Sequence, residues 1–427
     1  MLGLVPAELW DYGLKDIGQG IATALGRNEP TTTLSIPGLG NCIPARSARA
    51  ALITAIKALE LPPDARIGVP LYCCAVVFKA IKTAGCRPRF IDVEPDTFCM
   101  SPADLRAKSS EVDAAVVVHM FGNVCDIPRL QEAAPGIPII EDCALSLGSK
   151  LNGHQTGSLG DIAAFSFRSG KYLSVGEGGA LFSSHVRINS LATQLISTLP
   201  SPNRTDECSH VVKTYLRSML RSKPFYGLVG YALWERYNKR VQYSAKSPIV
   251  LSQIYRSDLA RAIKRLPHID SMIESQRANA DYYSRTLDLD PTMLCHERFG
   301  AFYNRYQYPI TFPSEDQRDL MAVYLHERGI ETSKPVNDVV DVTTAHYNYA
   351  GDCPTAERLS KTVLVIPSYH TLKKAEIQRI VDCVNQGWKQ VSADARIDVL
   401  MNRDSAGEAP VAAGFAQHSP KSARTSA

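Results

Sequence analysis

The stretch Ser166-Phe-Arg-Ser-Gly-Lys171, followed at once by Tyr172-Leu-Ser-Val-Gly-Glu-Gly-Gly179, decides the fold of this chain. The apolar residues that lead into it, Ile162–Phe167, are typical of a short buried strand. A similar apolar run, Ile137–Ile140, leads into the acidic pair Glu141-Asp142. Ligands of open α/β sheets bind at the carboxyl ends of strands. The sequence therefore places a carboxylate, a serine and a lysine where such a sheet binds its ligand.

Lys171 and Asp142 are the residue types that pyridoxal phosphate chemistry requires. A lysine amine forms an imine with a carbonyl compound, and a carboxylate serves as the partner of the pyridinium nitrogen. A lysine or an acidic pair taken alone is more commonly a solvated surface group. Their place at strand ends favours the other interpretation, in which Lys171 and Asp142 are catalytic and the cofactor is pyridoxal 5'-phosphate.

Strand-like runs alternate with helical stretches through the first half of the chain. This alternation predicts an α/β fold with a mainly parallel sheet and helices on both faces. Ser47 is a plausible cap for a helix over Ala48–Leu59. The expected strands are Arg66–Pro70, Arg87–Val93, Ala114–Met120, Pro138–Asp142, Ile162–Phe167 and Gly179–Ser183.

The second half predicts a smaller α+β domain. A long helix is expected over Ser257–Leu287, kinked or divided at Pro267. Strands at Tyr306–Phe312 and Val363–Pro367 and helices at Ser314–Arg328 and Lys373–Gln386 follow. The expected organisation is an N-terminal segment (1–33), a large cofactor-binding domain (34–255) with a basic helical insertion at about 190–248, a connecting helix with a small C-terminal domain (256–390), and a disordered tail (391–427).

Composition narrows the classes of function. The 427 residues carry a formal net charge of +4, which gives no case for nucleic-acid binding. Eleven cysteines and ten histidines lack the spacing of metal ligands, so no metal site is predicted. No apolar signal segment opens the sequence, and the longest uncharged apolar run, 225–234, is about half of the ~20 residues that a membrane-spanning helix needs. We expect a cytoplasmic protein without a transmembrane segment.

The predicted insertion carries a local basic excess. Residues 204–248 contain nine Lys/Arg and three Asp/Glu, a net charge of +6. Such a run is usually a solvated helical face. The alternatives are a subunit contact, a clamp for a phosphate-bearing substrate, or a patch that rests peripherally on a membrane surface.

Several motifs recur in a fixed order from about residue 34 to 388. Together they resemble the DegT/DnrJ/StrS-type family of nucleotide-sugar aminotransferases, which has the aspartate-aminotransferase (type I) fold of pyridoxal-phosphate-dependent transferases. The matching segments are Ser47-Ala-Arg-Ala-Ala-Leu52, Val69-Pro-Leu-Tyr-Cys-Cys74, Ala84-Gly85, Phe90-Ile-Asp-Val93, Val118-His-Met-Phe-Gly122, Ile140-Glu-Asp-Cys-Ala144, Gly157-Ser-Leu-Gly-Asp161, Phe165-Ser-Phe167, Lys171, Gly329-Ile-Glu331 and Pro367-Ser-Tyr-His370.

The resemblance implies a role for each matching residue. Lys171 would carry the cofactor covalently and then move a proton during the reaction. Asp142 would keep the ring nitrogen protonated. Ser166 would donate its hydroxyl to the phosphate, together with the amides of Ala48 and Arg49 at the start of a helix.

Three positions depart from the family pattern or stay open. Cys74 stands where many members have an aromatic ring over the cofactor, so stacking is weaker or comes from Tyr72. Leu145 replaces a Gln or His that can hydrogen-bond the cofactor's 3-oxygen. His119 either approaches the cofactor or is a buried, hydrogen-bonded histidine.

The resemblance implies an aminotransferase that moves an amino group from an amino acid to a nucleotide-linked keto sugar, for polysaccharide or natural-product biosynthesis. The expected amino donor is glutamate. Lys171 favours this over the family's sugar dehydratases, some of which have histidine there. The alternatives are an enzyme acting on a carbocyclic or other small ketone, and a degenerate member that serves sensing or interaction. Proteins of this fold build their sites at a dimer interface, so a homodimer is expected.

Overall fold

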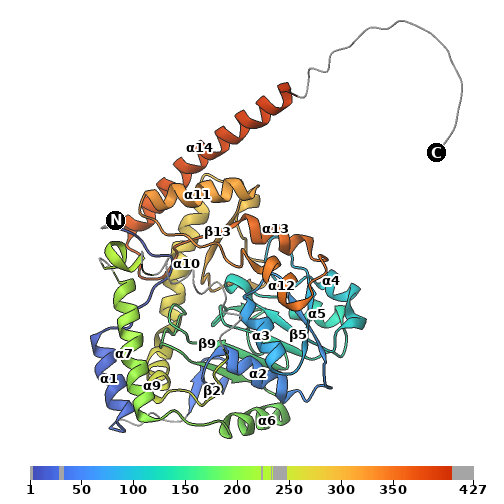
Figure 1. The fold of residues 1–427 in the computed structure, drawn as a ribbon, viewed down its shortest axis with the longest axis vertical. Coiled ribbons are helices and arrows are strands. Elements are labelled where there is room, and N and C mark those ends of the chain that lie inside the picture. Colours follow the sequence, from blue (N-terminus) through green and yellow to red (C-terminus); the bar gives the residue numbers. More distant parts are fainter. Residues whose placement is uncertain (1–2, 28–32, 223–224, 232, 234–247, 406–427) are drawn as a thin grey trace, which may run out of the picture.

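The computed structural model describes residues 3–27, 33–222, 225–231, 233 and 248–405. An eight-stranded sheet in the order β1-β2-β10-β9-β6-β5-β3-β4 forms its centre (Figure 1). Five neighbouring strands run parallel, and β10 is antiparallel to both β9 and β2. The strands are β1 (Leu34–Ile36), β2 (Gly40–Ala45), β3 (Arg66–Pro70), β4 (Arg87–Ile91), β5 (Ala114–Val118), β6 (Ile139–Asp142), β9 (Ile162–Ser166) and β10 (Gly179–Phe182).

Helices cover both faces of this sheet, because its central strands are apolar on both sides. All five residues of β5 are buried, as expected for a central parallel strand. Val116 and Val118 face one core cluster and Ala115 and Val117 face another, since successive side chains of a strand point to opposite faces. The first cluster includes α2 (Ala48–Ala58), α3 (Ala75–Thr83) and α6 (Val186–Ser197). The second includes α4 (Pro102–Ala107) and α5 (Ile127–Ala133).

Part of the chain after residue 255 forms a second, smaller apolar cluster, while α9 (Arg256–Arg265) and the helices near 339–362 pack in the cores of the large sheet. The expected long helix divides near Pro267, where a single 3₁₀ turn separates α9 from α10 (Ile269–Thr286). The strands β12 (Tyr308–Thr311) and β13 (Val363–Ile366) pair antiparallel and share an apolar core with the surrounding helices. The remaining C-terminal helices are α11 (Glu315–Glu327), α12 (Val339–Tyr347), α13 (Pro354–Thr362) and α14 (Lys374–Ser405). A separate three-stranded sheet forms where β11 (Ala301–Phe302) pairs with the hairpin of β7 (Lys150–Leu151) and β8 (His154–Gln155).

The N-terminal residues are built into both halves. Val5 donates its amide to Gly329 O and accepts the amide of Glu331, and its side chain joins the smaller core. Helix α1 (Leu14–Ala24) packs against α7 (Arg204–Arg221) and α9 (Figure 1). Residues 3–24 therefore connect the large sheet to the C-terminal part of the chain.

The structure differs from the sequence-based expectation at the C-terminus. A disordered tail was expected from residue 391, yet α14 continues as a single helix to Ser405 and leaves the body of the protein (Figure 1). Residues such as Ala393, Ala395 and Met401 have high helix propensity, and beyond residue 391 the first glycine comes only at Gly407. The rest of the expected tail, 406–427, lies outside the described residues, as do 223–224, 232 and 234–247 of the expected basic insertion. Among the helices of the described ranges, none is long and apolar enough to cross a membrane.

Candidate active site

Three neighbouring strands bring the acidic pair and the serine to one edge of the sheet. β6 lies between β5 and β9, and Asp142 pairs in register with Val118 on one side and Ala164 on the other. The carboxyl ends of these parallel strands therefore meet, as expected for a ligand site. Successive side chains point to opposite faces of a strand, so the side chains of Glu141 and Asp142 lie in different surroundings.

Glu141 is fully buried and stabilises the neighbouring loop. Its two oxygens accept four hydrogen bonds, from the amides of Gly157, Leu159 and Gly160 and from His119 Nε2, at 2.7–2.9 Å. Although burial opposes ionisation, these donors hold the pKa of Glu141 below its usual value. Glu141 is thus committed to the loop at 157–160.

His119 is a buried, hydrogen-bonded histidine. Its Nδ1 accepts the amide of Cys125 at 3.1 Å, so the ring proton is on Nε2, which donates to Glu141. His119, Glu141 and Cys143 offer donor atoms within 4.8 Å of one another, but both ring nitrogens and both carboxylate oxygens are already engaged. Burial also raises the pKa of the Cys143 thiol well above its usual range, whereas a metal binds the thiolate. Hydrogen bonding accounts for this cluster without a metal.

Lys171 is carried by a compact loop that folds back on itself after β9. The amide of Phe167 donates to Gly178 O and that of Ser169 to Gly176 O. Within this loop the amide of Lys171 donates to Arg168 O at 2.9 Å. The ring of Tyr306 lies 5.0 Å from Lys171 Nζ. The loop and the ring together fix the position of the amine.

The surroundings of Lys171 favour a neutral amine. Burial, followed by the nearby Arg168 guanidinium, lowers the pKa of Lys171 to about 8, against the opposing charges of Glu8, Cys74 and Asp142. A lysine with a lowered pKa is a better nucleophile near neutral pH.

Asp142 interacts with the same amine. Its Oδ1 accepts the amide of Ala144 at 3.0 Å, and its side chain is buried. Burial raises the pKa of Asp142, and the Ala144 amide and Lys171 oppose this rise. The structure thus brings the two residues chosen from the sequence into one electrostatic site, which Cys74 also joins as an exposed thiol at the start of α3.

Ser166 and Ala48, which precedes Arg49 in the first turn of α2, meet at Gly179. Gly179 pairs with Ser166 across β9 and β10, and a Cβ on Gly179 would lie only 2.7 Å from the amide nitrogen of Ala48. Only glycine permits this approach of the helix start to the strands. Ser47 Oγ caps α2 by accepting the amide of Ala50, while the first-turn amides of Ala48 and Arg49 have no partner within the helix. A hydroxyl and two helix-start amides suit a phosphate, so these residues fit the phosphate end of the predicted cofactor.

Tyr72 cannot provide the stacking ring suggested by the sequence. Its side chain has no exposed surface and packs against Phe98 and Phe121, with ring centroids 5.9 and 6.2 Å away. A fully buried ring has no face to offer a ligand. Leu145 packs its side chain against the core and offers its carbonyl to Asn304 at 2.9 Å. Cys74, in contrast, presents an exposed thiol.

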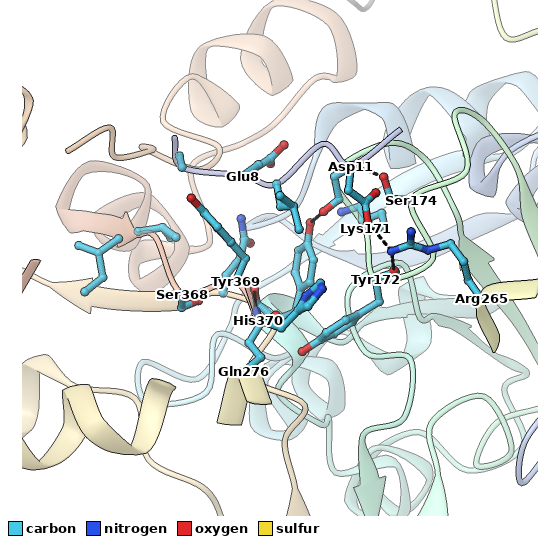
Figure 2. A pocket seen from close by; sticks show the side chains of 17 residues that line it. Glu8, Asp11, Lys171, Tyr172, Ser174, Arg265, Gln276, Ser368, Tyr369 and His370 are labelled. Atoms are coloured by element: carbon cyan, nitrogen blue, oxygen red, sulfur yellow. Dashed lines mark hydrogen bonds and ion pairs between the residues drawn. The ribbon is translucent and has the colours of Figure 1, made fainter. Parts of the chain in front are cut away.

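A pocket opens beside Lys171, and residues from distant parts of the chain line it (Figure 2). Four N-terminal residues, Ala7, Glu8, Leu9 and Asp11, form one wall. Glu8 reaches the lysine loop because Gly170 has no side chain: a Cβ there would lie 2.9 Å from Glu8 Oε2. The polar lining residues are Glu8, Asp11, Lys171, Tyr172, Ser174, Arg265, Gln276, Tyr306, Gln307, Ser368, Tyr369 and His370.

An ion pair and several further titratable groups lie in this pocket. Arg265 Nη2 lies 2.5 Å from Asp11 Oδ2. Burial opposes ionisation of Glu8, but Arg168, Arg221 and Lys171 hold the pKa of its carboxyl below the usual value. Burial lowers the pKa of His370. The pocket can therefore present carboxylates, a guanidinium and an imidazole to a polar substrate beside the lysine.

Sequence reasoning missed most of this pocket. His370 belongs to the motif Pro367-Ser-Tyr-His370, which the sequence singled out without a role. Glu8 and Asp11 fall in the N-terminal segment outside the recognisable motifs, and Arg265 falls within the expected long helix without an assigned role. Only the motif at 367–370 could have pointed to this pocket, because its residues match the family pattern without an evident role in the fold.

The chain resembles aminotransferases along most of its length. It is 25% identical over 368 residues to the UDP-N-acetyl-3-dehydro-alpha-D-glucosamine 3-aminotransferase of Acidithiobacillus ferrooxidans, which covers 84% of this chain and 88% of the relative. A shorter match, 34% identical over 145 residues, links it to the L-glutamine:2-deoxy-scyllo-inosose aminotransferase of Streptomyces kanamyceticus and covers 33% of this chain and 34% of the relative.

The solved apo structure of the sugar aminotransferase Spr1654 from Streptococcus pneumoniae matches with a TM-score of 0.70 at 18% identity, over 92% of this chain and 99% of that one. This match confirms the expected transferase fold, and the same protein is known in forms with pyridoxal and pyridoxamine phosphate. The model of the DegT/DnrJ/EryC1/StrS aminotransferase family matches residues 36–215 and 242–385. The chain therefore belongs to this family of sugar aminotransferases, whose cofactor is pyridoxal phosphate.

Proposed function

We propose that this enzyme transfers an amino group from glutamate to the keto group of a nucleotide-linked sugar. The observation that carries the reaction is Lys171, a buried amine with a lowered pKa. It lies at the end of the sheet with Asp142 and with Ser166 and the amides of Ala48 and Arg49, which together we call the Ser166 cradle. The near full-length similarity to a relative named for a UDP-linked 3-keto sugar supports the acceptor class.

Each residue contributes one task. Ser166 and the amides of Ala48 and Arg49 hold the phosphate, and the Asp142 carboxylate holds the proton on the ring nitrogen. The cofactor, when bound, supplies a carbonyl that carries the amino group and a ring that delocalises electrons. Lys171 Nζ takes a proton from the donor carbon and returns one to the acceptor carbon. The side chains of the pocket orient the substrates beside this amine.

A carbocyclic ketone is the second candidate acceptor. The local similarity to an inosose aminotransferase favours it, although that similarity spans a third of each chain. Both acceptors are polyhydroxylated rings, and the polar pocket side chains suit either of them. What separates the two is the nucleotide, which a carbocycle lacks.

The test is a two-step assay on the purified holoenzyme. Glutamate is expected to remove the visible absorption of the lysine-linked cofactor and to release 2-oxoglutarate. The resulting amino form is then offered keto sugars with and without a nucleotide, and a carbocyclic ketone. Return of the visible band only with nucleotide-linked sugars supports the proposal. Return only with the carbocycle supports the second candidate, and a band that no amino acid discharges supports a non-catalytic member. Light scattering on the same sample tests the expected homodimer.

Cofactor capture by the apoprotein is expected to accelerate as pH rises toward 8 and to level off above it. The neutral amine is the nucleophile, and the pKa of Lys171 is about 8, so the rate rises about tenfold per pH unit below that value. The Glu8 carboxylate raises the pKa of Lys171. Its removal in Glu8→Gln lowers that pKa and moves the midpoint to lower pH.

The measurement is the growth of the visible band after apoprotein and cofactor are mixed, across a pH series on both sides of 8. Glu132→Gln, which changes an exposed carboxylate on α5, is the matched control and should keep the wild-type midpoint. A Glu8→Gln midpoint that is unchanged or higher would contradict the placement of Glu8 beside the lysine.

A further inference from the structure

Helix α7 exposes a stripe of apolar side chains. Val212, Leu216 and Leu220 are 40%, 46% and 37% exposed and lie four residues apart, which places them on one side of the helix. The opposite side, including Val211, packs toward α1 and α9 (Figure 1). α7 thus has one face in the core and a second apolar face directed outward.

Positive charge flanks this stripe. Lys213 and Arg217 are exposed and each follows a stripe residue by one position, about 100° around the helix. Neither forms a hydrogen bond or ion pair with another residue of the described ranges. Phe225, 53% exposed, follows four residues after the end of the helix. We call these residues, Val212, Lys213, Leu216, Arg217, Leu220 and Phe225, the α7 surface.

Part of the α7 surface lies in an addition to the family, whereas Val212 and Lys213 lie within the matched residues. The family model matches residues 36–215 and resumes at 242, so the last turn and a half of α7 and the chain after it lie outside the matched residues. Residues 216–241 carry six Lys/Arg and one Asp/Glu, a net charge of +5. This charge exceeds the +4 of the whole chain. The added segment is therefore more basic than the rest of the chain.

We propose that the α7 surface docks on an anionic lipid membrane. A helix with an apolar stripe and flanking Lys/Arg lies in the membrane interface, with its apolar side chains among the acyl chains and its cations at the lipid phosphates. This proposal concerns the location of the enzyme and is independent of the reaction.

The charge and the apolar stripe argue against two other binding partners for the α7 surface. A two-fold contact between copies places the same patch against itself, which would bring Lys213 and Arg217 of one copy against those of the other. A nucleic acid matches the positive charge but gives the exposed Val212, Leu216 and Leu220 no apolar partner. An anionic bilayer satisfies both the apolar stripe and the charge.

The test is cosedimentation of the full-length holoenzyme with vesicles. Wild type is expected to bind phosphatidylglycerol vesicles, to bind phosphatidylcholine vesicles much less, and to lose binding as salt rises, because the screening length falls from about 10 Å at 0.1 M to about 3 Å at 1 M. The double variant Leu216→Glu/Leu220→Glu is expected to bind at least about tenfold more weakly, since two apolar side chains no longer enter the lipid.

The matched control is Leu320→Glu/Val323→Glu, which makes the same changes at apolar side chains of α11 that are 53% and 56% exposed. It should bind as wild type does. Retention of the visible cofactor band and of the unfolding temperature shows that each variant is folded. The proposal is overturned if wild type does not bind the anionic vesicles, or if both double variants weaken binding equally. It is also overturned if only the α7 variant dissociates a dimer, by light scattering, while vesicle binding is absent.

Discussion

The Lys171→Ala variant is expected to lose the visible absorption of the lysine-linked cofactor and at least about 10²–10⁴-fold in aminotransfer. The range is what general acid–base catalysis alone contributes, and the covalent role of the amine adds to it. Folding should be little affected, because burial already disfavours the charge of this amine and its removal relieves that cost. The readouts are the visible spectrum after cofactor addition, the rate of 2-oxoglutarate release from glutamate, and the thermal unfolding temperature.

Lys150→Ala is the control for this experiment, since Lys150 is an exposed lysine on the β7–β8 hairpin. It should keep both the band and the rate. A Lys171→Ala protein that still forms the same visible band would show that another amine carries the cofactor. The Ser166 cradle does not depend on the lysine, so the variant should still bind the cofactor non-covalently, which equilibrium dialysis can measure.

The sequence predicted the strand-end part of the site because that part is local. An apolar run followed by a polar residue marks the end of a parallel strand, and the ends of neighbouring strands meet at one edge. Asp142 and Ser166 follow from this rule, and the glycine at 179 is explained by the approach of Ala48. The division of the long helix at Pro267 is equally local, since proline lacks the amide that a continuous helix needs.

The rest of the site depends on packing between segments far apart in the sequence. Glu8 reaches the lysine loop across more than 160 residues, and nothing in its local sequence indicates that contact. Tyr72 follows the end of β3, where the alternation of a strand no longer fixes the direction of a side chain, and its buried ring packs against Phe98 and Phe121. The antiparallel placement of β10 between β9 and β2 was likewise hidden, because its apolar run is the same in either direction.

Asp142→Asn and Glu141→Gln are expected to have opposite effects, although the two residues are adjacent. The side-chain amide introduced by Asp142→Asn keeps an oxygen for the Ala144 amide but lacks the negative charge. The unfolding temperature of the apoprotein should therefore change little while aminotransfer falls. A hydrogen bond to a charged group contributes about 1.5–3 kcal/mol, which corresponds to a loss of roughly ten- to hundredfold in rate. Cofactor affinity should fall with it, and this is measured by titration of the visible band.

Glu141→Gln is expected to destabilise the fold by about 3 kcal/mol or more, because one carboxylate oxygen that accepts two hydrogen bonds becomes an NH₂ group facing donors. The unfolding temperature of the apoprotein should drop by several degrees, while the folded fraction retains Asp142 and its visible band. If Asp142→Asn instead lowered the unfolding temperature and Glu141→Gln instead lowered the rate per folded enzyme, the two carboxylates would have exchanged roles. That outcome would require the two side chains to face opposite to their directions in β6, because Glu141 is saturated by the loop at 157–160 and only Asp142 lies within reach of the charge of Lys171.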